Sequence, residues 1–311
     1  MTLLYDDPCF LGHATGQHPE RAARLRAIAE RLQATGLGDR CVRPELKPCD
    51  RRRLARVHSP KYIDEIWALA KSGGGYVDAD TIVSPASYDV ALMAAGSVVD
   101  AVERVLRGED RTALCLVRPP GHHAMVDRAM GFCLFNNIAI GAKVAAEEFR
   151  LDRILIVDFD IHHCNGTQAT FWEDPRVGLL SIHRWPFYPG TGSEDEEGGG
   201  RARGTKLNLP IEFGTPREDT LAAFASNLQK FADRMKPQLV LASAGFDAHV
   251  KDPVGNLGLE TEDFVTITDL ILEVARAHSG GRLVSVLEGG YNPPVLAECV
   301  GDHLQRMLEP K

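Results

Sequence analysis

Residues 154–163 read ILIVDFDIHH, and this stretch decides the fold. Its first part, Ile154–Val157, is an apolar run without polar alternation, which is typical of a strand buried in a parallel sheet. Side chains alternate along a strand, so Asp158, Asp160 and His162 fall on one face at its carboxyl end. A carboxylate and an imidazole at one point in space are half of a zinc site. The plainer alternative is an aspartate that only caps the next helix.

Apolar segments that end in polar or turn residues recur along the chain. Between them lie patterns of helical period at 138–149, 221–235 and 262–277, with Thr261 as the predicted N-cap of the last. This alternation predicts an α/β fold of three layers, with a central, mostly parallel sheet and helices on both faces. Ligands of such folds bind beyond the carboxyl ends of the strands. The other predicted strands are 113–117, 177–182, 239–242 and 283–287.

The composition is that of an ordinary globular protein of 311 residues, with 44% hydrophobic and 25% charged residues. We predict one domain over 1–311. The net charge of −8 argues against binding to nucleic acid or to an anionic membrane. No apolar run approaches the ~20 residues that cross a bilayer, and no export signal is visible. Seven scattered cysteines without a Cys-x-x-Cys pair fit reduced thiols, and we expect a cytoplasmic protein.

The segment 190–204 has neither helical nor strand periodicity, and it contains the acidic run Glu194–Glu197 followed by three glycines. These features predict a long surface loop. Two interpretations stay open for it. It is either a lid or pocket rim, or a solvated acidic run without a function.

Polar clusters follow four of the predicted strands and therefore meet at one edge of the sheet. Together they carry aspartates, histidines and a tyrosine beside glycines, which favours a metal-dependent hydrolase. The clusters are Gly121–Ala124, Asp158–Gly166, Ser243–Asp247 and Glu288–Tyr291.

These clusters resemble the motifs of the histone deacetylase superfamily, in particular its bacterial, class II-like branch of histone deacetylase-like amidohydrolases and acetylpolyamine amidohydrolases. The resemblance extends over nearly the whole chain. It implies an arginase/deacetylase-like fold, a zinc-dependent deacetylase activity on a linear amide and an acylated lysine or acylated small amine as substrate. The matching motifs include HPER at 18–21, RPPGHHA at 118–124, GFCLFNN at 131–137, PGTG at 189–192 and LEGGYN at 287–292.

The resemblance implies, position by position, that Asp160, His162 and Asp247 hold a catalytic Zn²⁺. Such a site keeps coordination positions open for water and the substrate carbonyl. Tyr291 would donate its hydroxyl to the oxyanion that develops in the transition state. Some deacetylase branches have histidine at that position and little activity on acetyl-lysine, so the tyrosine favours a competent enzyme.

The two adjacent histidines receive different roles from the same resemblance. His123 corresponds to the general base that later protonates the leaving amine, and His122 is its more buried neighbour, paired with Asp158. Asn165 stands where the class I branch has an aspartate. A neutral amide leaves His123 less basic than a carboxylate would, which places the chain nearer to class II.

The family's substrate channel and cation site also find matching positions. Phe132 and Tyr188 resemble the aromatic walls around a linear aliphatic side chain, with Gly131 and Gly290 beside them. In the plainer alternative these aromatics belong to the core. Arg21 matches a position in an internal cavity beneath the zinc, with a structural salt bridge as the alternative. A site for a monovalent cation, K⁺, would involve Asp158, Asp160, His162, Ser181 and Ile182.

Cys164 departs from the family pattern, which has glycine there. If the backbone required a positive φ, cysteine would cost roughly 1 kcal/mol. A thiol that tunes the zinc site is a further hypothesis. Cys164 also argues against an arginase-like binuclear manganese site, which needs a carboxylate at this position. An acyl-lysine binding module with little turnover is the alternative of another class.

The substrate is the least determined feature. Acetyl-lysine in a protein, an acetylated polyamine and a longer acyl-lysine all present a narrow chain that ends in an amide. One polyamine-selective branch has glutamate where this chain has Val254, which argues mildly against polyamines. Asp78, Asp80 or the acidic run would still supply negative charge at the rim. A homo-oligomer is compatible with the resemblance, but the sequence does not specify one.

Overall fold

The computed structural model describes residues 1–309. Within them, one sheet has the strand order β2-β1-β5-β10-β9-β6-β7-β8, and every neighbouring pair is parallel. A short antiparallel ribbon pairs β3 with β4. The strands are β1 (Thr2–Tyr5), β2 (Cys41–Val42), β3 (Gly75–Tyr76), β4 (Ile82–Val83), β5 (Thr112–Cys115), β6 (Ile154–Asp158), β7 (Val177–Trp185), β8 (Lys206–Glu212), β9 (Leu239–Ala244) and β10 (Leu283–Leu287).

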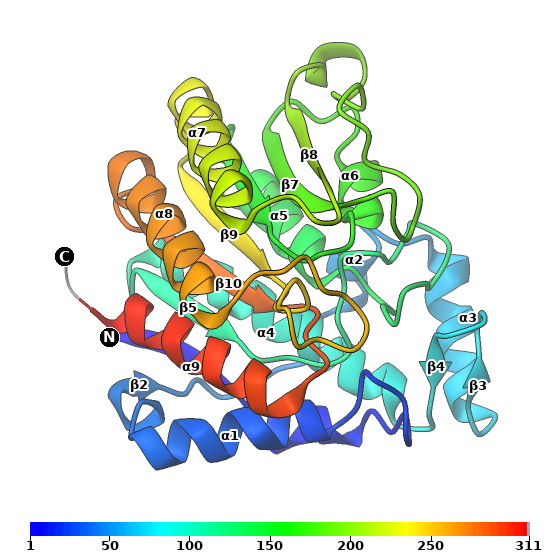
Figure 1. Cartoon of the computed structure of the whole chain (residues 1–311). Coiled ribbons are helices and arrows are strands. Elements are labelled where there is room, and N and C mark those ends of the chain that lie inside the picture. The colour runs from blue at the N-terminus through cyan, green and yellow to red at the C-terminus, as the bar shows by residue number, and fades with distance from the viewer. Residues whose placement is uncertain (310–311) are drawn as a thin grey trace.

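Helices cover both faces of the sheet, as Figure 1 shows. One layer contains α7, α8, α9 and α1, which pack side by side, and the other contains α4 and α5. The predicted three-layer α/β architecture is therefore confirmed. The helices are α1 (Ala23–Thr35), α2 (Arg51–Leu54), α3 (Pro60–Lys71), α4 (Ser87–Arg107), α5 (Asn137–Glu147), α6 (Asn165–Thr170), α7 (Arg217–Met235), α8 (Thr261–Ser279) and α9 (Pro293–Leu308).

The five apolar segments predicted as strands are β5, β6, β7, β9 and β10, while β1, β2, β8 and the short strands β3 and β4 were not predicted. β8 lies at an edge of the sheet and is only partly buried, so its apolar signal is weak. The predicted N-cap of α8 is wrong by one residue. Glu260 is the cap, because its side chain and that of Asp263 each bond to the other's backbone N–H.

The register of the sheet brings the polar strand ends to one level. Asp158 at the end of β6 pairs with Ser181 of β7 on one side and with Ser243 of β9 on the other. Leu287 at the end of β10 pairs with Ala244 of β9. The segments that follow these strands consequently emerge side by side at the carboxyl edge.

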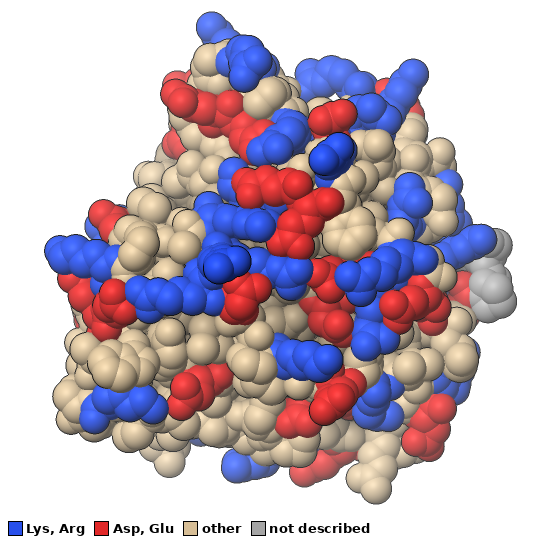
Figure 2. Space-filling view, turned by 180° about the vertical axis from the view of Figure 1, so that it is seen from behind, with Lys and Arg blue, Asp and Glu red and all other residues tan. Residues whose placement is uncertain are grey.

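The outer surface carries charges of both signs. Figure 2 shows the face opposite to that of Figure 1, where lysine and arginine side chains are interspersed with aspartate and glutamate. Several charged residues of the chain form ion pairs, and one of these pairs joins Arg53 to Glu148. Among the helices of residues 1–309, we find none with the length and apolar character required to cross a bilayer. The final two residues of the predicted domain lie outside the described residues.

Candidate active site

Two aspartates and a histidine from two strand ends form the centre of the site. Asp160 and His162 follow β6, and Asp247 follows β9. The Nδ1 atom of His162 lies 2.9 Å from Oδ1 of Asp160 and 3.2 Å from Oδ2 of Asp247. All three side chains are buried, and their potential ligand atoms lie within 4.8 Å of one another.

This donor set fits a divalent cation. Oδ2 of Asp247 is buried without a hydrogen-bond partner, which leaves a strong acceptor unsatisfied. Burial and the neighbouring Asp160 raise the pKa of Asp247, and a cation between the two carboxylates would relieve that crowding. A Cβ atom at Gly289 would lie 2.2 Å from Oδ2 of Asp247, so only glycine lets the backbone approach these ligands. Two carboxylates and an imidazole suit Zn²⁺.

The backbone holds both carboxylates in place. The N–H of His162 and the N–H of Gly289 donate to the two oxygens of Asp160, at 2.9 and 2.8 Å. The N–H of Ile161 donates to Oδ1 of Asp247 at 3.0 Å. Among the four carboxylate oxygens, Oδ2 of Asp247 is the one that has no hydrogen bond.

The adjacent histidines have opposite electrostatic environments. Nδ1 of His122 lies 3.1 Å from Asp158, and although burial disfavours its charged form, Asp160, Asp158 and Glu288 raise its pKa to about 10. Burial, His122 and His162 hold the pKa of His123 well below its usual value. Nδ1 of His123 is 2.7 Å from Oδ1 of Asn165. Because an amide oxygen only accepts, Nδ1 carries the proton and Nε2 is the basic nitrogen.

Tyr291 follows β10 and completes the group. Burial, together with Asp247 and Asp160, raises the pKa of its hydroxyl well above the usual value, so the hydroxyl stays protonated. Its backbone N–H donates to Asp252 at 2.6 Å. The guanidinium of Arg24 lies 5.1 Å from the centre of the Tyr291 ring.

The expectation that Arg21 lies in the interior beneath the site is wrong. Arg21 is partly exposed and bonds to Gln17. Arg24, three residues further on and fully buried, instead donates to the carbonyl oxygen of Gly290 at 2.6 Å. Sequence reasoning missed Arg24, which lies in the first turn of α1.

A pocket of about 220 Å³ opens onto this group. Phe132, Tyr188 and Gly131, all predicted for the substrate channel, line it, whereas Gly290 is not among its lining residues. A Cβ at Gly131 would come within 2.3 Å of the His123 ring, which explains the glycine there. Phe187 was not predicted; its ring stacks on His162 with centroids 5.2 Å apart. The remaining lining residues are Asp80, His123, His162, Val254 and Tyr291.

Cys164 does not require the strained backbone that was considered for it. Its φ is −78°, which any residue adopts, so that expectation is wrong. The side chain is fully buried beside Ser181 and Asp158, and burial raises the pKa of the thiol well above its usual value. Ser181 and Ile182, predicted for a K⁺ site, are buried residues of β7. Cys164 is therefore a neutral thiol packed behind the strand ends.

The segment 190–204 is a loop, apart from a short 3-10 turn at Gly200–Ala202. One residue of its acidic run turns inward. Glu196 accepts hydrogen bonds from the N–H of Gly192 at 2.9 Å and from Nε2 of Gln168 at 2.5 Å. Thr191 of the same loop lies 2.8 Å from Nδ1 of His163. The loop therefore holds the segment that follows β6 through hydrogen bonds.

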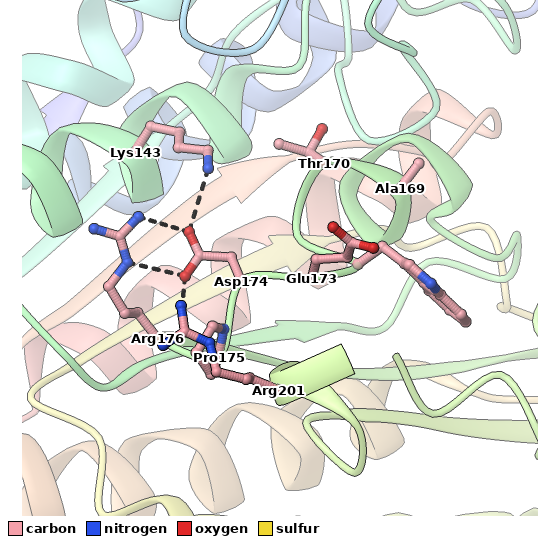
Figure 3. A pocket seen from close by; sticks show the side chains of 9 residues that line it. Lys143, Ala169, Thr170, Glu173, Asp174, Pro175, Arg176 and Arg201 are labelled. Atoms are coloured by element: carbon pink, nitrogen blue, oxygen red, sulfur yellow. Dashed lines mark hydrogen bonds and ion pairs between the residues drawn. The ribbon is translucent and has the colours of Figure 1, made fainter. Parts of the chain in front are cut away.

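A larger hollow of about 810 Å³ lies elsewhere, around the end of α6 (Figure 3). Three of its charged groups are already paired, because Asp174 receives hydrogen bonds from Arg176 at 2.7 Å and from Lys143 at 3.3 Å. None of the clustered aspartates and histidines lines it. The smaller pocket is consequently the better candidate for catalysis.

Comparisons with known proteins show the family to which this chain is similar. The model of the histone deacetylase domain matches residues 18–307. The histone deacetylase-like amidohydrolase of Pseudomonas aeruginosa is 36% identical over 94% of this chain and 76% of its own. The human polyamine deacetylase HDAC10 is 39% identical over 98% of this chain and 46% of its own. The crystal structure of the HDA15 HD domain superimposes with a TM-score of 0.93 at 33% identity, covering 100% of this chain and 91% of that one.

Proposed function

The chain belongs to the histone deacetylase family, and we propose that it is a zinc-dependent amidohydrolase that removes an acetyl or other acyl group from a lysine-like amine. The observation that carries this proposal is one pocket of about 220 Å³ lined by a neutral His123, a protonated Tyr291 and His162 of the metal-binding group. Such a combination serves metal-assisted amide hydrolysis. We further propose that residues 1–311 form one deacetylase domain.

Asp160, His162 and Asp247 would hold the zinc. When bound, the metal supplies Lewis-acid polarisation of the amide carbonyl and of water. His123 then takes a proton from the attacking water at Nε2 and later gives it to the leaving amine. Its low pKa keeps it unprotonated and ready for the first of these steps.

The remaining polar groups orient this pair and stabilise charge. Asp158 holds His122 in its charged form next to His123, with the two rings 4.0 Å apart. The positive charge of His122 stabilises negative charge that develops on the substrate. The Tyr291 hydroxyl donates to the same oxyanion. Asn165 fixes the tautomer of His123.

The narrow pocket selects for a linear chain. Phe132 and Tyr188 form its walls, and the Phe132 ring stands edge-on to Tyr291 at 5.6 Å. An aliphatic stem with a terminal amide fits between such walls. The K⁺ site at Asp158, Asp160, His162, Ser181 and Ile182 remains part of the proposal. A cytoplasmic location is also proposed, since all seven cysteines are free thiols.

An acetylated polyamine is the second candidate substrate. Asp80 lines the pocket. Burial raises the pKa of Asp80, and the neighbouring carboxylate of Asp78 raises it further. These carboxylates would attract a distant ammonium group. Val254 lines the same pocket without a charge, which favours acyl-lysine as the first candidate.

Turnover on both substrate classes tests the proposal. The metal-free protein would be loaded with Zn²⁺, and acetate release would be measured from an acetyl-lysine peptide and from an acetylated polyamine. We expect one bound zinc per chain and turnover that a chelator abolishes. Asp247→Asn should lose zinc, as measured by elemental analysis. Zinc binding without acetate release from either substrate would favour the acyl-lysine binding module instead.

A further inference from the structure

The carboxylate of Glu288 lies buried behind the catalytic histidines and has no role in the steps above. Oε2 accepts hydrogen bonds from the consecutive backbone N–H groups of Gly121 and His122, at 2.7 and 3.2 Å. Oε1 accepts one from the hydroxyl of Ser243 at 3.1 Å. Glu288 thus joins the ends of β10 and β9 to the turn that carries both histidines.

The backbone next to Glu288 is tied to the other catalytic groups. Its own carbonyl oxygen accepts a hydrogen bond from Arg24 at 2.5 Å. The next residue, Gly289, donates to Asp160 at 2.8 Å. Tyr291 follows two residues later. One short segment therefore connects the histidine turn, a metal ligand and the hydroxyl that faces the oxyanion.

We propose that Glu288 is a positioning residue that fixes the histidine turn relative to Tyr291 by accepting the N–H groups of Gly121 and His122. The inference rests on the proposed function. Consecutive backbone N–H groups form a concave donor site for which a carboxylate is the natural occupant. The reach of the Glu288 side chain then sets how far the histidines stand from the segment that carries Tyr291.

A second metal site is the competing interpretation, because potential ligand atoms of His122, Cys133 and Glu288 lie within 4.8 Å of one another. The contacts argue against it. Both oxygens of Glu288 are occupied by three donors, Nδ1 of His122 is engaged by Asp158, and the Cys133 thiol donates to the Gly131 carbonyl oxygen at 3.3 Å. The thiol pKa is also raised well above its usual value by burial, so a thiolate ligand is disfavoured.

Two substitutions of Glu288 distinguish the effect of its side-chain length from the effect of its charge. Glu288→Gln keeps the length and an accepting oxygen for both N–H groups, and its NH₂ group can donate to Ser243. Glu288→Asp keeps the charge but withdraws the carboxylate by one carbon. Glu298→Ala, an exposed glutamate on α9, is the matched control. A misplacement of about 1 Å costs on the order of 10²-fold in rate.

The experiment measures kcat and KM per bound zinc for the wild type and the three variants. We expect Glu288→Asp to lose roughly 10–10²-fold in kcat at nearly unchanged KM, and Glu288→Gln to stay near the wild type. The reverse order would show that charge matters rather than reach, and it would overturn the inference. Full kcat per zinc in both variants, even with lowered thermal stability, would overturn it too. A wild type without turnover would instead overturn the proposed function.

Discussion

At the scale of single residues, the amide of Asn165 contacts His123, the proposed general base. Its Oδ1 accepts from Nδ1 of His123 at 2.7 Å without adding a charge. Burial, followed by the neighbouring His122 and His162, lowers the pKa of His123. A base with a low pKa stays unprotonated into the acidic range, so the activity should extend to low pH.

Asn165→Asp should move the acidic limb of the rate profile upward. A carboxylate beside His123 favours the imidazolium form and raises the pKa of His123. At a given acidic pH, a larger fraction of the enzyme is then protonated at His123 and inactive. The measurement is kcat/KM against pH for the wild type and the variant. An acidic limb that stays in place, or shifts downward, would show that His123 is not the group that titrates.

Cys164→Gly should leave catalysis nearly intact and lower stability. The buried thiol is neutral and lies against Ser181 and Asp158, so its loss removes packing and adds backbone freedom, worth about 1 kcal/mol. Urea unfolding measures the stability, and zinc analysis with acetate release measures the site. A marked change in zinc content or in kcat would revive the hypothesis that this thiol tunes the metal.

Motif residues with a distinctive chemical type were predictable individually, whereas supporting residues were not. Asp160 and His162 were predicted from their residue types at the end of a strand, and Asp247 was added by the resemblance to the family; the structure brings the three together. Arg21 was chosen because it matches a family position, and the sequence does not show that Arg24, at the start of α1, is the arginine that faces inward. Glu288 was visible in its cluster, but its partners are backbone N–H groups, which carry no signature in the sequence.

At the scale of elements, the sheet fixes the site and a loop supports it. The central strands were predictable because they are mostly apolar and are buried along their whole length. The edge strand β8 and the two-residue β2 were not, since neither has a continuous apolar run. The inward turn of Glu196 was hidden by its acidic neighbours, because a charge run gives no sign of which member folds back.

Glu196→Ala should loosen the 190–204 loop. Glu196 accepts the N–H groups of Gly192 and Ser193 and a side-chain bond from Gln168, and the substitution leaves these three donors without that partner. We expect faster amide hydrogen exchange at Gly192 and Ser193. Glu194→Ala is the control, since Glu194 is exposed. Equal exchange rates in the two variants would contradict an anchoring role for Glu196.

At the scale of the whole molecule, a buried charge network joins the amino-terminal segment to the strand ends. Glu20 contacts Nη2 of Arg118 at 2.8 Å and Nη1 of Arg24 at 3.2 Å. Arg24 in turn bonds to the Gly290 carbonyl oxygen beside Tyr291. Burial opposes ionisation of Glu20, but the two arginines lower its pKa from 4.5 to about 2.

Glu20→Gln should destabilise the protein by about 3 kcal/mol near neutral pH. Because the pKa of Glu20 is lower in the folded state, its contribution is complete above about pH 4.5 and is lost as the pH falls toward about 2. Urea unfolding at several pH values would therefore show a difference between wild type and variant that shrinks in acid. A difference independent of pH would contradict this account.

The most direct test of the central claim is the kcat of zinc-loaded Tyr291→Phe on an acetyl-lysine peptide. Removing one oxyanion donor should lower kcat by roughly 10²–10³-fold. Zinc content and unfolding midpoint should stay as in the wild type, because the buried hydroxyl is not a ligand of the metal. A variant that releases acetate at the wild-type rate would contradict the assignment of this pocket as the catalytic site.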